Sequence, residues 1–221
     1  MPVKFNQYWT VDFDKIREYE KFIIRKYIPG INKLGIHIVA GWTVLIGGYS
    51  ETILEGISND LELLERALTD KKYRDLSDEL QDYIKKYKNK VLVKTGKKDH
   101  YSKEIKKNTV KFSQTWDVIS RHKDLYERYV TETYYPCLEG LGIKVAREWE
   151  VLIGGGPRIV CEGRTQDIDS TTLISNLQSS KFQKAKQGLK QFVENYESRI
   201  LTFHIQKVLG YKSASYELIS G

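Results

Sequence analysis

Apolar and polar side chains alternate along the first residues of the chain. Successive side chains of an extended strand point to opposite faces, so this alternation predicts a strand over residues 4–11. One face of that strand would carry Phe5, Gln7, Trp9 and Val11. Large side chains then recur every three or four residues, at Ile16, Tyr19, Ile23 and Tyr27. This spacing predicts a helix.

The end of this helix and the strands after it are marked by proline and glycine. Pro29 is expected to disrupt the last helical turns, because proline has no backbone N–H group. Gly35 suits the left-handed conformation that follows a helix. Alternation resumes over residues 36–46 and predicts a long strand, which a glycine-rich turn at 47–50 joins to a strand at 51–56. These two strands are therefore expected to be antiparallel neighbours.

A second helix in two parts follows the predicted hairpin. The first part covers residues 61–68, and the second runs to about Tyr87 after a break at 69–70. A strand at 90–93 completes the unit. The order β-α-β-β-α-β is the ferredoxin-like arrangement.

The whole pattern occurs twice. The run Trp42-Thr-Val-Leu-Ile-Gly-Gly48 returns as Trp149-Glu-Val-Leu-Ile-Gly-Gly155, and a shift of 107 residues lays Lys4 on Lys111 without a gap through Gly56 on Gly163. Later the shift becomes 109, which pairs Tyr87 with Tyr196. The sequence thus predicts an α+β fold of two tandem ferredoxin-like repeats, at 1–95 and 110–208, with a basic linker at 96–109 and a tail at 209–221.

Composition narrows the class of protein. The 221 residues are 40% hydrophobic and 12% aromatic, enough for ordinary buried cores, and no run of about 18 apolar residues occurs. The chain enters its first strand without a signal-peptide pattern, so a cytoplasmic protein without a membrane partner is expected. The net charge is +7, but the lysines concentrate between 85 and 111, which indicates a solvated linker rather than a nucleic-acid surface.

The repeated Leu-Gly-Ile element, the run Trp-x-Val-Leu-Ile-Gly-Gly and the split helix resemble the dimeric α/β-barrel superfamily, and most closely its NIPSNAP-like members. The aromatic residue at the start of the second helical part, Tyr73 or Phe182, belongs to the same pattern. The resemblance covers both repeats. It implies that two antiparallel sheets pack as an intrachain α/β barrel.

This superfamily includes cofactor-free monooxygenases, haem-dependent enzymes and many members of unknown activity. Fold membership does not choose between these activities, and their catalytic residues are not shared. No catalytic residue is therefore transferred to this chain by the resemblance.

Two glutamates are the candidate catalytic residues. If the first strand pairs antiparallel with the third, Gln7 should approach Glu55, and Gln114 should approach Glu162. A carboxylate there, beside Trp9 or Trp116, would be partly desolvated and suited to general acid–base chemistry. The alternative is a buried polar pair that only fixes the strand register.

The two faces of the long strand differ between the repeats. Trp42 and Trp149 fall on its most apolar phase and are expected to pack under the helices. The opposite face of the strand offers space for a ligand in the first repeat and charged side chains in the second. Such a difference is expected where only one of two duplicated sites keeps a ligand. The alternative is that the charges form an ion-pair network within the sheet. The candidate ligand-binding residues of this face are His37, Thr43, Glu148 and Glu150, in addition to Gln7, Trp9, Gln114 and Trp116.

Metal and cofactor signatures are weak. Cys137 and Cys161 have no metal-ligand spacing, and no cofactor or metal site is predicted. The one candidate haem ligand is His204 in the last predicted strand. The strands that match the RNA-binding strand of β-α-β-β-α-β modules lack its aromatic and basic signature.

The leading functional hypothesis is a NIPSNAP-like tandem barrel that binds a small, mostly apolar molecule between its sheets. The alternatives are a cofactor-free monooxygenase-like or haem-dependent enzyme, and an assembly protein that forms homo-oligomers. The sequence alone does not select among them.

Overall fold

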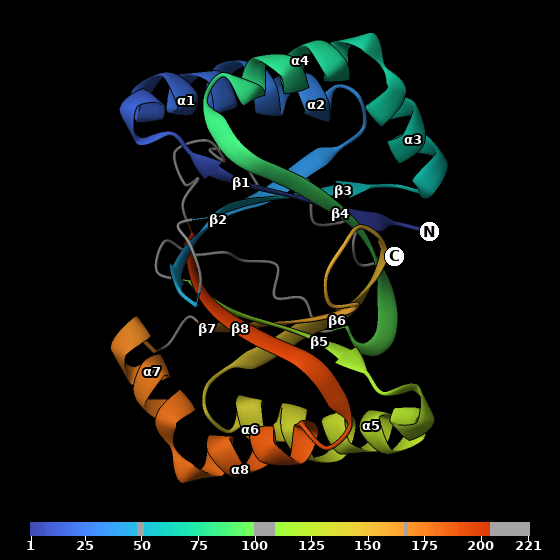
Figure 1. Cartoon of the computed structure of the whole chain (residues 1–221), viewed down its shortest axis with the longest axis vertical. Helices are drawn as coiled ribbons and strands as arrows, with labels where there is room; N and C mark the ends of the chain where they lie inside the picture. The colour runs from blue at the N-terminus through green and yellow to red at the C-terminus, as the bar shows by residue number, and fades with distance from the viewer. Residues whose placement is uncertain (48–50, 100–108, 166–167, 204–221) are drawn as a thin grey trace. The chain divides into compact units, whose positions relative to one another are not determined.

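The computed structural model describes residues 1–47, 51–99, 109–165 and 168–203 (Figure 1). They divide into two compact units, residues 1–44 with 51–93, and residues 45–47 with 94–165 and 168–203. His204, the tail at 209–221 and most of the predicted linker lie outside the described residues. Within them, no helix is long and apolar enough to cross a membrane.

The two halves of the chain repeat one order of elements. The first half consists of β1 (Val3–Val11), η1 (Phe13–Lys15), α1 (Ile16–Phe22), η2 (Ile23–Tyr27), α2 (Ile28–Asn32), β2 (His37–Ile46), β3 (Thr52–Ser58), α3 (Leu61–Thr69), α4 (Lys71–Gln81) and β4 (Ile84–Asp99). The second consists of β5 (Val110–Val118), η3 (Ser120–His122), α5 (Lys123–Tyr129), η4 (Val130–Tyr134), α6 (Tyr135–Glu139), β6 (Lys144–Ile153), β7 (Ile159–Thr165), α7 (Ser170–Gln178), α8 (Ser180–Leu189) and β8 (Val193–Phe203).

All the strand pairs within each repeat are antiparallel. The order is β4-β1-β3-β2 in the first repeat and β8-β5-β7-β6 in the second. This is the ferredoxin-like order, and it confirms the expected pairing of the second strand with the third. The hydrogen-bonded strand neighbours close a ring of eight, which confirms the predicted α+β barrel class.

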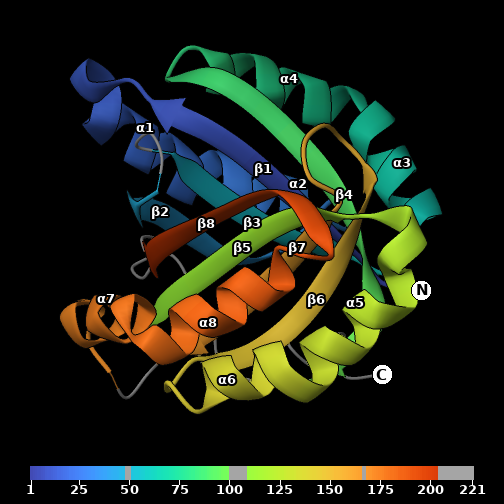
Figure 2. The same cartoon turned by 60° about the horizontal axis from the view of Figure 1, so that its bottom comes forward.

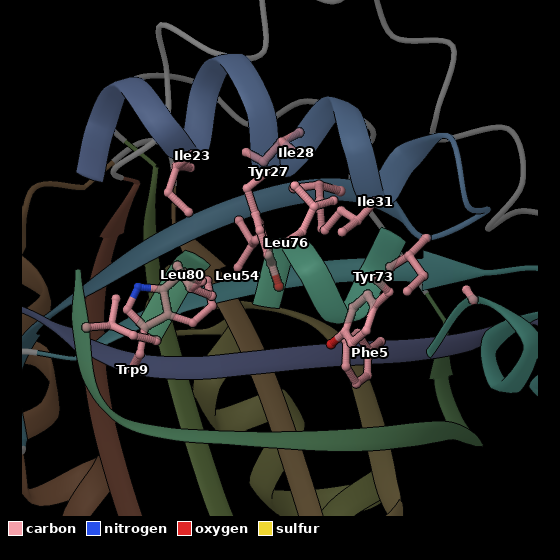
Figure 3. Packing of buried hydrophobic residues seen from close by; sticks show 14 of the residues in the cluster. Phe5, Trp9, Ile23, Tyr27, Ile28, Ile31, Leu54, Tyr73, Leu76 and Leu80 are labelled. Atoms are coloured by element: carbon pink, nitrogen blue, oxygen red, sulfur yellow. The ribbon is translucent and has the colours of Figure 1, made fainter. Parts of the chain in front are cut away.

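Helices cover one face of each sheet. In the first repeat the core joins Phe5, Trp9 and Leu54 of the sheet to Tyr27 and Leu76 of the helices (Figure 3). Figure 2 shows α5, α6 and α8 on one face of the sheet in the second repeat. Each repeat therefore has a helix-covered face and an opposite face, and both carry buried side chains.

The first long helix continues past its proline. Pro29 lies in the first turn of α2, directly after the π-helical segment η2, and Pro136 lies after η4 in the same way. The wider π turn accommodates the missing N–H group, so the expected disruption of the last turns does not occur. The helix ends as predicted, with Gly35 at a φ of 91°.

The second helix is split as expected, but its end differs from the prediction. Asp70 caps α4 by accepting a hydrogen bond from the Lys72 N–H group, and α4 ends at Gln81. Tyr87 therefore lies on β4, which extends to Asp99 and includes the first residues of the predicted linker. The sequence misled here because the large residues at 76, 80, 83 and 87 keep a helical spacing across the boundary between helix and strand.

Candidate functional site

The strand register places several predicted site residues together on the helix-covered face of the first repeat. Trp9 on β1 lies opposite Thr52, which in turn lies opposite Thr43 on β2. Two residues further along β3, Leu54 lies opposite Gln7 on β1 and opposite Gly41 on β2. Directly opposite residues share a face, so Gln7, Trp9 and Thr43 all lie under the helices.

Gln7 is the centre of a tyrosine network in this core. Its Nε2 atom lies 2.6 Å from Tyr27 Oη, 3.0 Å from Tyr87 Oη and 3.3 Å from Tyr73 Oη. Tyr27 descends from the helix toward the sheet between the side chains of Trp9 and Tyr73 (Figure 3). The ring of Trp9 stacks on that of Tyr87, with centroids 6.3 Å apart. This network therefore joins the sheet, the π-helical segment, α4 and β4.

Three polar side-chain atoms on this face of the sheet have no hydrogen-bond partner among the residues that the structure describes. They are Gln7 Oε1, on a side chain with 0% exposure, Thr43 Oγ1, and Ser58 Oγ at the end of β3. An enclosed polar atom without a partner costs about 1–3 kcal/mol, so such atoms usually meet water or a ligand. The first repeat thus presents hydrogen-bonding capacity that its own described residues do not use.

The second repeat carries the same network with the amide turned round. Gln114 Oε1 accepts hydrogen bonds from the hydroxyl groups of Tyr134 and Tyr196, the latter at 2.9 Å. Its Nε2 atom has no partner in the described part of the chain. Trp116 stacks on Tyr196 as Trp9 does on Tyr87.

A buried carboxylate distinguishes the second repeat from the first. Glu148 lies opposite Cys161, at the position that Gly41 holds in the first repeat, and its side chain has 0% exposure. Its Oε2 accepts hydrogen bonds from Tyr126 Oη, at 2.7 Å, and from Tyr135 Oη. Its Oε1 lies 3.0 Å from Lys97 Nζ. The charge that distinguishes the two repeats therefore lies under the helices of the second one.

The expected approach of the glutamines to the glutamates is wrong. Asn6 lies opposite Glu55 and Ser113 opposite Glu162, so each glutamine is one position out of register with its glutamate. A shift of one residue moves a side chain to the other face of the sheet. Glu55 and Glu162 are consequently buried on the faces opposite to the helices.

On those faces the two glutamates form buried ion pairs. Lys4 Nζ lies 2.9 Å from Glu55 Oε1, and both side chains have 0% exposure. Lys111 Nζ pairs with Glu162 Oε1, and Trp149 Nε1 donates to Glu162 Oε2 at 2.9 Å. The acid–base role of the two glutamates stays a prediction, and their contacts are those of buried structural ion pairs.

The prediction that Trp42 and Trp149 pack under the helices is also wrong. The pairing of β2 with β3 shifts between Ile38 and Ala40, and that of β6 with β7 shifts between Val145 and Arg147. Each bulge inserts one residue, so the alternation along the strand changes phase. Trp42 then lies opposite Ile53, and both tryptophans share the face of the buried ion pairs.

Two other predicted site residues lie apart from the networks. His37 is half-buried at the start of β2, opposite Ile57 and away from the helices. Glu150 lies on the helix-covered side, but its side chain is 46% exposed and its carboxylate pairs with Arg158 at 3.2 Å. The described residues contain no group of three or more His, Cys, Asp or Glu side chains that could hold a metal ion.

Burial raises the pKa of six tyrosines on the helix-covered faces. Desolvation raises the pKa of Tyr27 and of Tyr73, and it raises the pKa of Tyr196 to about 12. The pKa values of Tyr126, Tyr134 and Tyr135 are raised by the same cause, and the nearby Glu148 carboxylate adds to the effect at Tyr126 and Tyr135. These hydroxyl groups therefore keep their protons at neutral pH.

The raised tyrosine pKa values predict a loss of stability in alkali. A tyrosine ionises near pH 10 when unfolded but at higher pH when folded, so its stabilising contribution is complete below pH 10. It is lost as the pH rises from 10 through about 12, the value for Tyr196. We expect the free energy of unfolding, measured in urea between pH 8 and 12, to fall steeply above pH 10, with the phenolate absorbance of the buried tyrosines appearing together with unfolding. Ionisation of all the tyrosines near pH 10 in the folded protein would contradict this.

Sequence reasoning missed the tyrosines and Lys97. The repeat alignment contained a signal for the tyrosines, because Tyr27 matches Tyr134 and Tyr87 matches Tyr196. Lys97 had no such signal, since it belongs to the predicted linker and reaches Glu148 only because β4 extends to Asp99.

Comparison with solved structures identifies the fold. A proposed monooxygenase from Fusobacterium nucleatum is 13% identical and superposes with a TM-score of 0.63 over 91% of this chain and 92% of that one. An anthrone oxidase-like protein is 10% identical, with a TM-score of 0.63 over 92% and 91% of the two chains. The fold is that of the dimeric α/β-barrel proteins.

Other comparisons add less. A NIPSNAP family protein from Agrobacterium tumefaciens is 19% identical and covers 43% of this chain and 95% of its own, with a TM-score of 0.37. No protein-family model matches the sequence, and no curated protein matches it. The comparisons therefore establish the fold alone.

Proposed function

We propose that the first repeat binds a small, mostly apolar molecule with a hydroxyl group between its sheet and its helices. The observation that carries this proposal is the Gln7 amide, which is fully buried and has one end without a partner in the described part of the chain. A hydroxyl group both donates and accepts, so it satisfies either end of the amide. The surrounding aromatic rings supply the apolar contact.

The position of Thr43 supports a ligand rather than a single water molecule. Its enclosed hydroxyl group lies on the same face as Gln7, two strands away and two residues along β3. Strand geometry places the two Cα atoms about 12 Å apart, a span that one water molecule does not bridge. A molecule with a polar group at each end would contact both side chains.

The difference between the repeats favours the first as the binding repeat. At the position of Gly41 the second repeat has Glu148, and at the position of Ile28 it has Tyr135. These two side chains bond to each other and occupy the helix-covered face of the second repeat. The corresponding residues of the first repeat, Gly41 and Ile28, have smaller and uncharged side chains.

This proposal moves the ligand from where the sequence suggested it, between the two sheets. The enzyme alternatives stay predictions. Monooxygenase and oxidase chemistry is named for proteins of the same fold, but identities of 13% and 10% transfer the fold alone. Glu148, the buried carboxylate under the helices of the second repeat, is held by a lysine and two tyrosines, and this arrangement fixes it in place.

Calorimetric titration with 2-naphthol tests the proposal. We expect 2-naphthol to bind more tightly than naphthalene, and Gln7→Leu to weaken the binding about tenfold, the value of one hydrogen bond near 1.4 kcal/mol. Thr43→Val, which keeps the side-chain shape, should weaken the binding of any ligand that contacts the Thr43 hydroxyl group. Gln114→Leu is the matched control in the second repeat and should leave the affinity unchanged.

Two outcomes would contradict this proposal. One is equal binding of 2-naphthol and naphthalene by the native protein. The other is an equal loss of affinity in the Gln7 and Gln114 variants, since that would place the ligand away from the first repeat. Circular dichroism of each variant separates loss of binding from loss of fold.

A further inference from the structure

The surface of the first repeat carries a groove that lies on the outer side of the helices, away from the Gln7 network. It has a volume of about 420 Å³ and is lined by residues of η2, α2 and α4. Small-molecule sites commonly have volumes of about 300–1,000 Å³. The groove is thus large enough for a small organic molecule.

The groove combines an apolar floor with a basic rim. At the floor the helices are in close contact, because a Cβ atom added at Gly30 would lie 2.5 Å from Leu76 Cδ1. Arg25, Lys33 and Lys72 stand on the rim. All three are exposed to solvent.

The acidic residues of the groove are already paired. Glu79 pairs with Lys26, and Asp75 pairs with Lys71 at 3.2 Å. Arg25, Lys33 and Lys72 have no ion-pair partner within the described ranges. Three cations therefore border one groove without a carboxylate bound to any of them.

The second repeat lacks this arrangement, although it has the corresponding helices. The counterparts of Arg25 and Lys33 are Glu132 and Gly140. Gly188, the counterpart of Glu79, has the Tyr129 side chain against it, and the Tyr129 hydroxyl group donates to the Ala185 carbonyl at 2.9 Å. The basic groove is therefore not a general consequence of this fold.

We propose that this groove binds a small organic anion that carries two or more carboxylate or phosphate groups on a compact apolar body. Charge complementarity selects the anionic groups, and the floor of Gly30 and Leu76 selects the apolar body. The volume favours a small molecule over an extended polymer. Each cation on the exposed rim contributes modestly, so the site recognises several anionic groups together.

Calorimetric titration with benzene-1,3,5-tricarboxylate, compared with the neutral benzene-1,3,5-tricarboxamide, tests this proposal. The native protein should bind the tricarboxylate more tightly, and added sodium chloride should weaken that binding. The double variant Arg25→Gln/Lys72→Gln should lower the affinity about tenfold, which corresponds to about 0.7 kcal/mol for each cation. Lys181→Gln/Lys184→Gln removes the same charge from α8 of the second repeat and should change the affinity less than about twofold.

The proposal is overturned if the tricarboxamide binds as well as the tricarboxylate, or if the two double variants lose affinity equally. The second result would show a general attraction to a basic protein. Neither result bears on the Gln7 network, because the probe is charged and the substitutions lie on the outer surface of the helices.

Discussion

Replacing Glu148 by alanine is expected to lower the free energy of unfolding by about 3–5 kcal/mol. The side chain has 0% exposure. Its carboxylate pairs with Lys97 and accepts hydrogen bonds from Tyr126 and Tyr135. Without it, the two tyrosine hydroxyl groups lose a buried acceptor, and Lys97, with 17% of its side chain exposed, loses a close counter-ion. An enclosed polar group that loses its partner costs the full desolvation penalty, which is why the expected effect is large.

Urea denaturation at pH 7 measures this effect. Glu150→Ala is the matched control, two residues along the same strand, because the Glu150 side chain is 46% exposed and pairs with the exposed Arg158. An exposed ion pair contributes about 0–1 kcal/mol, so the control should remain near the native stability. A loss below about 1 kcal/mol for Glu148→Ala would show that the cluster does not hold the second repeat together.

The second large effect is expected at the buried ion pair of the first repeat. Lys4→Met should lower the free energy of unfolding by about 3–5 kcal/mol, because it leaves the Glu55 carboxylate in a site with 0% exposure without the ammonium group 2.9 Å away. The double variant Lys4→Met/Glu55→Met should recover most of that loss, since an apolar pair of similar volume avoids the cost of burying two charges.

A double-mutant cycle in urea measures this coupling. The expected interaction energy between Lys4 and Glu55 is at least about 2 kcal/mol, in the upper part of the range for contacting residues. If the losses of the two single variants simply add up in the double variant, the expected coupling is contradicted, because the two groups then do not stabilise each other. That result would return Glu55 to consideration as an acid–base residue.

The sequence predicted the fold well because both its signals are local and repeated. Alternation in β1 and helical spacing in α1 define the elements, and the ungapped match between the halves fixes one order for both. A repeat that reads twice as β-α-β-β-α-β leaves few arrangements, and the ferredoxin-like sheet is one of them.

The sequence predicted the site less well because the facing of a side chain depends on a single residue of register. Gln7 and Glu55 were placed together by a pairing one position away from the observed one. The bulge in β2 reversed the facing of Trp42 in the same way. Neither shift changes the hydrophobic pattern much, because both faces of these sheets are buried and both accept large apolar groups.

The duplication supplies internal controls for functional tests. Both repeats keep a buried glutamine that is bonded to tyrosines and lies next to a stacked tryptophan, but only the second has a carboxylate at the position of Gly41. Because the network is shared, the Gln7 and Gln114 variants should lose similar amounts of stability, whereas only the Gln7 variant should lose affinity for the ligand. Comparing Gln7 with Gln114 therefore separates ligand binding from stability more cleanly than any single substitution.

The most direct measurement is a high-resolution crystal structure of the protein with 2-naphthol bound. We expect the molecule to lie between the sheet and helices of the first repeat, with its hydroxyl group within about 3 Å of the unpartnered end of the Gln7 amide. A complex in which 2-naphthol lies elsewhere, with the Gln7 amide bonded to other groups of the chain or to water, would contradict it.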